Sequence, residues 1–262
     1  MKDYVSENNR ILSEWRKKYD ENSFAPDGIM FRGEIDEDCN ERYSDKELEN
    51  KLWNEAPLRV LFLTKDQNAG EDCDAWDVRG ETGNLSYAFF RNLMYQLYGL
   101  VNTTPEYKAD YTFTNEQAIE LYKTFPIARI NAKKEKGNSS VSNHTLKYYI
   151  ERDGDFLKKQ ILNLDADIII CCGYSDHVED TGNILLNFLK KECYNNLENK
   201  DDTGWKDDEG WIYYDTKKKK LAINNWHFSA RIKSEEWYYK ITNAYHHFLE
   251  KHSDFVKSHR KI

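Results

Sequence analysis

Four short apolar stretches separate the polar segments of the chain, and each has the length of a β-strand. They are RVLFLT (Arg59–Thr64), IARIN (Ile127–Asn131), DIIICC (Asp167–Cys172) and LAINN (Leu221–Asn225). The first and third are continuously apolar, which is typical of strands whose two faces are both covered by helices. A shorter stretch, WIYY (Trp211–Tyr214), predicts a further strand at an edge of the same sheet.

Apolar residues recur at helical spacing in the segments that flank these strands. The stripes are Ile11, Leu12, Trp15 and Tyr19; Phe89, Phe90, Leu93, Met94 and Leu97; Leu146, Tyr149, Ile150, Phe156, Ile161 and Leu162; Ile184, Leu185, Phe188 and Leu189; and Trp237, Ile241, Tyr245, Phe248 and Leu249. Thr114 and Gln117 form a capping box for a further helix, which ends at Pro126. Ser142 is suited to cap the helix that carries the third stripe.

Strands that alternate with helices imply right-handed crossovers and parallel pairing. We therefore expect an α/β fold, a three-layer αβα sandwich with a central, mostly parallel four-stranded sheet. The 262 residues contain no internal repeat and no linker-like stretch. A single domain over residues 1–262 is expected, with residues 1–56 as an N-terminal helical segment packed on it. Ligands of such sheets bind beyond the carboxyl ends of the strands, so the segments after the strands are the informative ones.

The net charge is −8, which argues against a protein that coats nucleic acid without specificity. A DNA enzyme needs only a local basic face, so that class stays open. The candidates for such a face are Lys133, Lys134 and Lys136, the run Lys217–Lys220, and the tail residues Lys257, Arg260 and Lys261. For the run Lys217–Lys220 a plain hairpin or strand-entry turn is the first interpretation.

The five cysteines form no CxxC motif and no Cys/His ligand set. Cys171 and Cys172 are adjacent in an apolar strand, where their side chains face opposite ways and do not readily pair. We expect reduced thiols, no metal and no cofactor. The N-terminus has no apolar signal core and no apolar run has membrane-spanning length, so a cytoplasmic location is expected.

The first strand is followed by a carboxylate, an amide and a glycine, at Asp66, Asn68 and Gly70. A small polar pocket would use them well: Asp66 is suited to activate a water, Asn68 to read a ligand edge, and Gly70 to let the backbone approach. The alternative is a polar turn in which Asp66 caps the next helix.

The second strand ends in Asn131, followed by Lys133, Lys134 and a Gly-Asn-Ser-Ser run. An Asn at a strand end is a rigid donor and acceptor, suited to recognise the Watson–Crick edge of a base. The lysines are suited to hold phosphates. A solvated basic loop with a structural Asn is an equally good interpretation of this segment alone.

The fourth strand ends in Asn-Trp-His-Phe-Ser-Ala-Arg, which places His227 directly after it, with Ser229 and Arg231 close behind. His227 is suited to donate a hydrogen bond to a developing anion, and Ser229 to contact a phosphate. A single His is more often structural, so its significance depends on the combination of the three loops.

Together these segments resemble the uracil-DNA glycosylase superfamily. FLTKDQN resembles the family's first motif, IARIN the strand that ends in its base-reading Asn, and NWHFSAR its His-Pro-Ser loop, while ADIIICCG resembles the buried strand between them. The resemblance spans roughly residues 59–231. It implies that Asp66 activates water, Asn131 reads the base, His227 stabilises the leaving base and Ser229 contacts a phosphate.

The chain departs from the family pattern at three positions. Gln67 replaces a proline, Phe228 replaces the Pro of His-Pro-Ser, and Asn68 stands where a tyrosine excludes bulky pyrimidines. Asn68 is shorter and has both a donor and an acceptor. We therefore expect a wider pocket that admits a base with a polar 5-substituent.

The resemblance implies a monofunctional DNA glycosylase that cleaves the N-glycosidic bond of a flipped uracil or modified pyrimidine, in DNA repair or anti-phage defence. DNA is then the expected partner. Tyr87 or Phe89 would stack on the base, and Ser229, Arg231, Lys133 and Lys134 would bind DNA phosphates. Two alternatives remain open: a non-catalytic relative that binds nucleotides or a partner protein, and an enzyme that hydrolyses free nucleosides or nucleotides.

Overall fold

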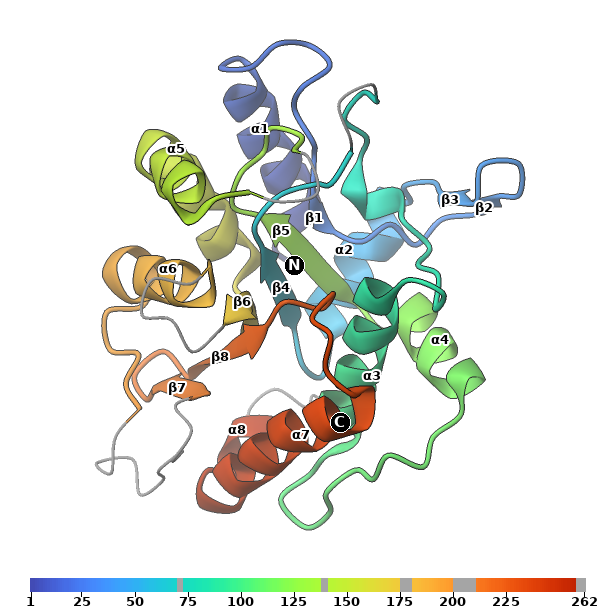
Figure 1. Ribbon diagram of the computed structural model, residues 1–262, viewed down its shortest axis with the longest axis vertical. Coiled ribbons are helices and arrows are strands. Elements are labelled where there is room, and N and C mark those ends of the chain that lie inside the picture. Colours follow the sequence, from blue (N-terminus) through green and yellow to red (C-terminus); the bar gives the residue numbers. More distant parts are fainter. Residues whose placement is uncertain (70–72, 138–140, 175–180, 200–210, 258–262) are drawn as a thin grey trace.

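The computed structural model describes residues 1–69, 73–137, 141–174, 181–199 and 211–257. Its centre is a six-stranded sheet in the order β1-β5-β4-β6-β8-β7 (Figure 1). The strands are β1 (Gly28–Ile29), β4 (Val60–Thr64), β5 (Ile127–Asn131), β6 (Ile168–Tyr174), β7 (Ile212–Asp215) and β8 (Lys220–Trp226). The four strands β5, β4, β6 and β8 are parallel neighbours, and β1 and β7 pair antiparallel at the two edges.

The four apolar stretches of the sequence are the four parallel strands, so the α/β class and the parallel pairing are confirmed. The sheet nevertheless has six strands instead of four. The edge strand expected at Trp211–Tyr214 is β7, and Lys217, Lys218 and Lys219 form the turn of its hairpin with β8, as the first interpretation of that run had it. The prediction missed β1, because two residues are too few to show an alternating pattern.

Side chains of each strand alternate between two separate cores. Val60 and Phe62 of β4 pack into one core, and Leu61 and Leu63 pack into the other. The first core is closed by α3 (Ala88–Asn102), α4 (Asn115–Thr124), α7 (Ser234–Lys251) and α8 (Asp254–Lys257). The second is closed by α1 (Tyr4–Arg16), α2 (Lys46–Glu55), α5 (Asn143–Leu164) and α6 (Thr181–Phe188). Helices therefore cover both faces of the sheet, as Figure 1 shows.

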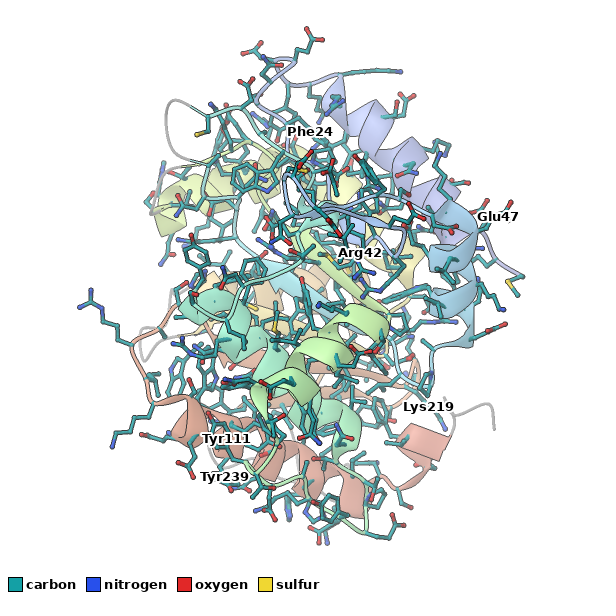
Figure 2. The ribbon with its side chains drawn as sticks, turned by 90° about the vertical axis from the view of Figure 1, so that its right-hand side faces the viewer. Phe24, Arg42, Glu47, Tyr111, Lys219 and Tyr239 are labelled. Carbon is teal, nitrogen blue, oxygen red and sulfur yellow. The ribbon has the colours of Figure 1, made fainter. Side chains whose placement is uncertain are left out.

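Local signals in the sequence set the helix ends. Thr114 and Gln117 form the predicted capping box at the start of α4, and the Ser142 side chain accepts the Thr145 N–H at the start of α5. The segment between α3 and α4 is held against α7, where the Tyr111 N–H donates to the Tyr239 hydroxyl at 3.2 Å (Figure 2). The described residues also contain the short helical segments η1 (Val78–Gly80) and η2 (Leu189–Cys193).

The N-terminal segment 1–56 is more than a helical addition, which corrects that part of the prediction. Between α1 and α2 it supplies β1 to the central sheet and a small hairpin of β2 (Ile35–Asp36) and β3 (Glu41–Arg42). The Arg32 guanidinium, in the segment between β1 and β2, donates to the carbonyls of Phe31 and Phe125. The segment thus contributes a strand to the sheet and is hydrogen-bonded to the end of α4.

All five cysteines are free thiols; Cys171, Cys172 and Cys193 are buried, and Cys39 and Cys73 are exposed. Burial raises the pKa of Cys193 to about 12, so its thiol stays protonated near neutral pH. None of the helices in the described ranges combines the length and the apolar character needed to cross a membrane.

Candidate functional site

The segments after β4 and β5 continue the parallel pairing beyond the strands. The N–H of Ala132 donates to Thr64, that of Lys133 to Lys65, and that of Gly137 to Gln67, at 2.8–2.9 Å. The bridge between Asn68 and Gly137 extends the same ladder. Asp66 therefore lies on a hydrogen-bonded extension of the sheet rather than on a free loop.

The Asp66 carboxylate is buried at this edge, with its side chain 2% exposed. Among the described residues its Oδ2 has no hydrogen-bond partner; the Lys133 Nζ lies 3.9 Å away. Burial raises the pKa of Asp66 above its ordinary value, and the charges of Lys65 and Lys133 oppose that rise. A β-carbon on Gly137 would lie 2.0 Å from Oδ2, so only glycine leaves room for the carboxylate there.

Lys133 points inward, although a phosphate contact was expected of it. Its Nζ donates to the carbonyls of Glu135 at 2.8 Å and Lys136 at 3.0 Å, and it lies 5.2 Å from the centre of the Tyr149 ring. Burial lowers the pKa of this ammonium, while Asp66 acts to raise it. The group acts on Asp66 through its charge instead of offering itself to a ligand at the surface.

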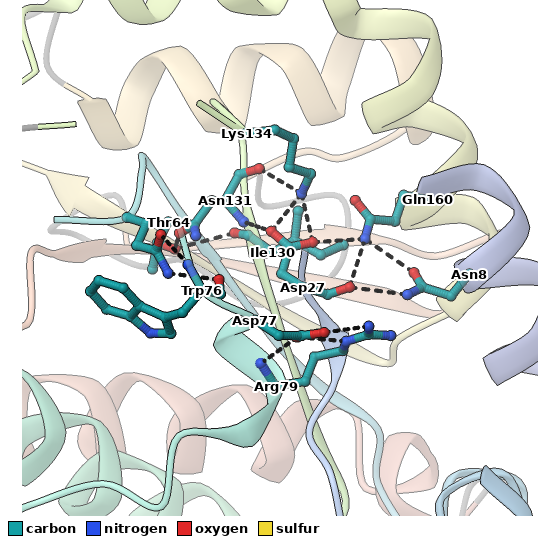
Figure 3. A network of polar contacts seen from close by, with 11 residues as sticks. Asn8, Asp27, Thr64, Trp76, Asp77, Arg79, Ile130, Asn131, Lys134 and Gln160 are labelled. Atoms are coloured by element: carbon teal, nitrogen blue, oxygen red, sulfur yellow. Dashed lines mark hydrogen bonds and ion pairs between the residues drawn. The ribbon is translucent and has the colours of Figure 1, made fainter. Parts of the chain in front are cut away.

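Lys134 was also expected to contact a phosphate, but its side chain is completely buried. Its Nζ lies 2.5 Å from Asp27 Oδ2 and donates to the Asn131 carbonyl at 2.8 Å (Figure 3). The predicted phosphate contact at Lys134 is wrong. Nothing in the local sequence signals this, because Asp27 lies 107 residues away along the chain.

Asn131 is held at both its main-chain groups and at its amide oxygen. Its N–H donates to Asp27 Oδ2 at 2.7 Å, and its Oδ1 accepts the Thr64 hydroxyl at 2.5 Å. Among the described residues its buried Nδ2 has no partner. Asn131 thus keeps one unused hydrogen-bond donor at the end of β5.

His227 follows β8 at the same edge and is partly buried. Burial, with the nearby charges of Lys65 and Arg129, lowers the pKa of His227 to about 4, so the ring is neutral near pH 7. Its Nδ1 accepts the Ser229 N–H at 3.2 Å. A neutral ring with an accepting Nδ1 has its proton on Nε2, which is therefore a donor.

The loop that carries His227 is fixed by α3, a role that the sequence analysis missed. Asn92 Nδ2 donates to the Phe228 carbonyl, and the Ser234 hydroxyl donates to Asn92 Oδ1, both at 2.7 Å. Phe228 is completely buried. A polar residue inside the apolar stripe of α3 was the available signal for Asn92.

A second missed group links the two sides of this edge. Arg129 of β5 forms an ion pair with Glu81, whose other oxygen accepts the Trp76 indole N–H. The Trp76 carbonyl in turn accepts the Gln67 amide at 2.9 Å. The Arg129 guanidinium lies 4.7 Å from the centre of the Phe89 ring. An arginine inside an otherwise apolar strand was the signal for this group.

The remaining predicted site residues lie at the surface or partly buried. Asn68, Tyr87, Ser229 and Arg231 are exposed, with Tyr87 65% exposed. Phe89 is partly buried, 6.0 Å from the His227 ring, and the Arg129 guanidinium lies over its face. Gly70, the Asn138–Ser140 run and the tail residues Arg260 and Lys261 lie outside the described residues.

Asp66, Asn131 and His227 occupy the same edge of the sheet. The charge of Lys65 acts to lower the pKa of both Asp66 and His227. Taken over the residues that the structure describes, the edge offers a buried carboxylate with a free oxygen, a neutral imidazole donor and an unused amide donor. Within the described residues no cluster of His, Cys, Asp or Glu is arranged to bind a metal ion.

Comparison with known proteins adds no relative: no protein-family model matches this chain, and no curated protein and no solved structure matches it either.

Proposed function

We propose that the protein is a DNA N-glycosylase of the uracil-DNA glycosylase type, with the three-layer sandwich of that superfamily. The single observation that carries the proposal is the pairing, at one sheet edge, of a buried carboxylate whose Oδ2 is free (Asp66) with a neutral histidine that donates through Nε2 (His227). Cleavage of a C–N glycosidic bond creates a cationic sugar and an anionic base. The two groups match these two charges.

Asp66 would serve the sugar side of the reaction. A carboxylate on the extended ladder is held rigidly, and its free Oδ2 can orient a water for attack on the anomeric carbon while stabilising positive charge there. Its raised pKa brings it closer to neutrality, where a general base is most effective.

His227 would serve the base side. Its Nε2 proton would be donated as a hydrogen bond to the departing anion, and the low pKa of the ring keeps it from carrying a charge of its own at neutral pH. The Ser229 N–H fixes this tautomer.

Asn131, Asn68, Phe89 and Tyr87 would bind the base. The free Nδ2 of Asn131 is a donor for a carbonyl or ring nitrogen on the base edge. Phe89 lies beside His227, and Tyr87, two residues before Phe89 in the chain, is exposed. Exposed Asn68 would contact a polar 5-substituent, so that a 5-modified cytosine is an expected substrate in addition to plain uracil.

DNA binding would depend on a few local contacts, because the chain as a whole is acidic. Ser229 and Arg231 are exposed directly after His227, where a phosphate flanking the flipped nucleotide would pass. Lys65, whose charge acts on both Asp66 and His227, adds positive charge at the site.

The proposal is tested by incubating the protein with oligonucleotides that each carry one uracil or one modified pyrimidine, and then cleaving abasic sites with alkali. We expect strand breaks at one class of base, and none with the Asp66→Asn/His227→Ala double variant. A double variant as active as the wild type would refute the mechanism, and inactivity on the whole panel would refute the proposed function.

One observation favours a second candidate, a relative that binds nucleotides without cleaving them. The Asp66 side chain is 2% exposed and Gly137 lies against it, which limits the access of water. In that case the same oligonucleotides would bind, with binding weakened by Asn131→Ala, but no base would be released.

A further inference from the structure

The ion pair between Asp27 and Lys134 encloses the main chain of Asn131. Both side chains are 0% exposed, and Lys134 Nζ lies 2.6 and 2.5 Å from the two carboxylate oxygens. Asp27 Oδ2 accepts the Asn131 N–H at 2.7 Å, and Lys134 Nζ donates to the Asn131 carbonyl at 2.8 Å (Figure 3). The two partners of the pair therefore hold the two peptide groups that flank the α-carbon of Asn131.

The ion pair is itself anchored to two helices. Gln160 of α5 donates to Asp27 Oδ1 at 2.8 Å and to Asn8 Oδ1 at 3.0 Å. Asn8 of α1 donates to the Asp27 carbonyl at 3.0 Å. A β-carbon on Gly28, which has a φ of 138°, would lie 2.4 Å from Asn8 Nδ2, so glycine is required for this approach.

A pair of this kind is weak evidence for stability. Desolvation of two buried charges offsets much of their attraction, and well-packed apolar residues of similar volume often stabilise a fold equally well. Its particular effect here is geometric, because it fixes the strand end from which Asn131 projects. Thr64 then fixes the amide oxygen, and among the described residues Nδ2 has no partner.

We propose that the Asp27–Lys134 pair is a positioning device for Asn131, which sets where its free Nδ2 meets the ligand. The inference rests on the proposed function, in which Asn131 reads the base. Lys134 then serves the site from inside the protein, through Asn131, instead of contacting DNA. A misplacement of about 1 Å in such a group costs on the order of a hundredfold in rate.

The test removes both charges and keeps the side-chain shapes, in the double variant Asp27→Asn/Lys134→Met. The matched control is Asp167→Asn/Lys220→Met, which removes another buried ion pair, with 3.3 Å between charged atoms and side chains 5% and 9% exposed. That pair lies at the opposite, amino ends of β6 and β8. Three quantities are measured for the wild type and both double variants. They are the thermal unfolding temperature, the side-chain amide NMR signal of Asn131 in ¹⁵N-Asn-labelled protein, and kcat/KM on a uracil oligonucleotide.

We expect both double variants to fold and to unfold at similar temperatures. In the Asp27/Lys134 variant alone, the Asn131 amide signal should move, its response to added free uracil should weaken at least tenfold in concentration, and kcat/KM should fall between tenfold and about a hundredfold. Equal losses in both variants would reduce the pair to a structural role and overturn the inference.

Failure of the proposed function gives a different result. If the wild type cleaves none of the uracil and modified-pyrimidine oligonucleotides, that function is refuted, and the Asn131 signal of the free protein still decides the inference. A signal that moves in the Asp27/Lys134 variant and not in the control upholds the positioning role. An unchanged signal, or unchanged kcat/KM in an active protein, refutes it.

Discussion

The two sides of the carboxyl edge differ in how they treat their polar groups. On the β4–β5 side, Asp66, Asn131 and Lys134 are all buried. On the β8 side, His227 is only partly buried, and Ser229 and Arg231 are exposed. Both sides begin directly after a core strand, so their contrast does not come from strand position.

The two sides differ in burial because different parts of the chain pack against them. The β4–β5 side has another chain segment, Phe24–Met30, against it, which supplies Asp27 and pairs with β5. Within the described residues, the β8 loop is held through Asn92 and buried Phe228. A rigid side suits groups that must be placed accurately, and an open side suits contacts to a large ligand.

The largest effect is expected in the buried side, from Lys134→Met. It leaves Asp27 charged and unpaired in the core, which should lower the free energy of unfolding by about 3–5 kcal/mol. Lys133→Met should cost much less, because the main partners of Lys133 are neutral carbonyls. Urea unfolding of the two variants measures the difference, and equal losses would mean that the two lysines are not differently placed.

Asp66→Asn should lower kcat/KM by about a hundredfold or more, the usual cost of losing one electrostatic stabiliser. Stability should not fall, because burial already disfavours the charged form of this carboxylate. Asp74→Asn, at an exposed position of the same connection, is the matched control. Activity that survives Asp66→Asn would move the chemistry away from the rigid side.

The two sides should respond to pH in opposite directions. His227 has its pKa lowered from 6.5 to about 4, so between these pH values the unfolded chain binds a proton that the folded chain does not. Stability should therefore rise with pH across this window, by on the order of 2 kcal/mol. The raised pKa of Asp66 has the opposite sign: its contribution is present at low pH and is lost as pH rises through the folded value.

Unfolding by urea at pH 4.5 and pH 7 separates the two groups. In His227→Gln the stability lost at the lower pH should shrink, whereas His144→Gln, an exposed position on α5, should behave like the wild type. An unchanged pH dependence in His227→Gln would show that the ring is not held neutral.

The smallest effect is expected at the rim, from Arg231→Ala. Binding of a uracil oligonucleotide should weaken a few-fold, and the slope of log K against log salt should fall by about 1, the loss of one phosphate contact. Lys251→Ala is the control, at the far end of α7, about 25 Å along the helix from its start. If both variants act alike, the open side makes no particular contact with DNA.

The regular part of this structure is predictable from sequence. Continuous apolar runs and capping residues such as Thr114 report local preferences, and the parallel sheet follows from their alternation. Lys134 shows where that reasoning stops. A charged residue in a polar loop is expected to be exposed to solvent. The burial of Lys134 depends instead on Asp27, Gln160 and Asn8, which only the tertiary structure brings together. Asn92 and Arg129 are predictable in part. Each stands out in the sequence as a polar residue in an apolar pattern, but the sequence does not say which group it contacts.

The main-chain hydrogen bonds that continue from β4 and β5 past the strand ends determine how fast the backbone at the site opens to solvent. The amides of Ala132, Lys133 and Gly137 donate to main-chain carbonyls in the same way as those inside the strands. Their protons should exchange with solvent deuterium at rates set by opening of the central sheet, minutes to hours or slower. The amide of exposed Arg231 should exchange within seconds to minutes. Hydrogen-exchange mass spectrometry would then find the boundary between slow and fast backbone running through the middle of the site.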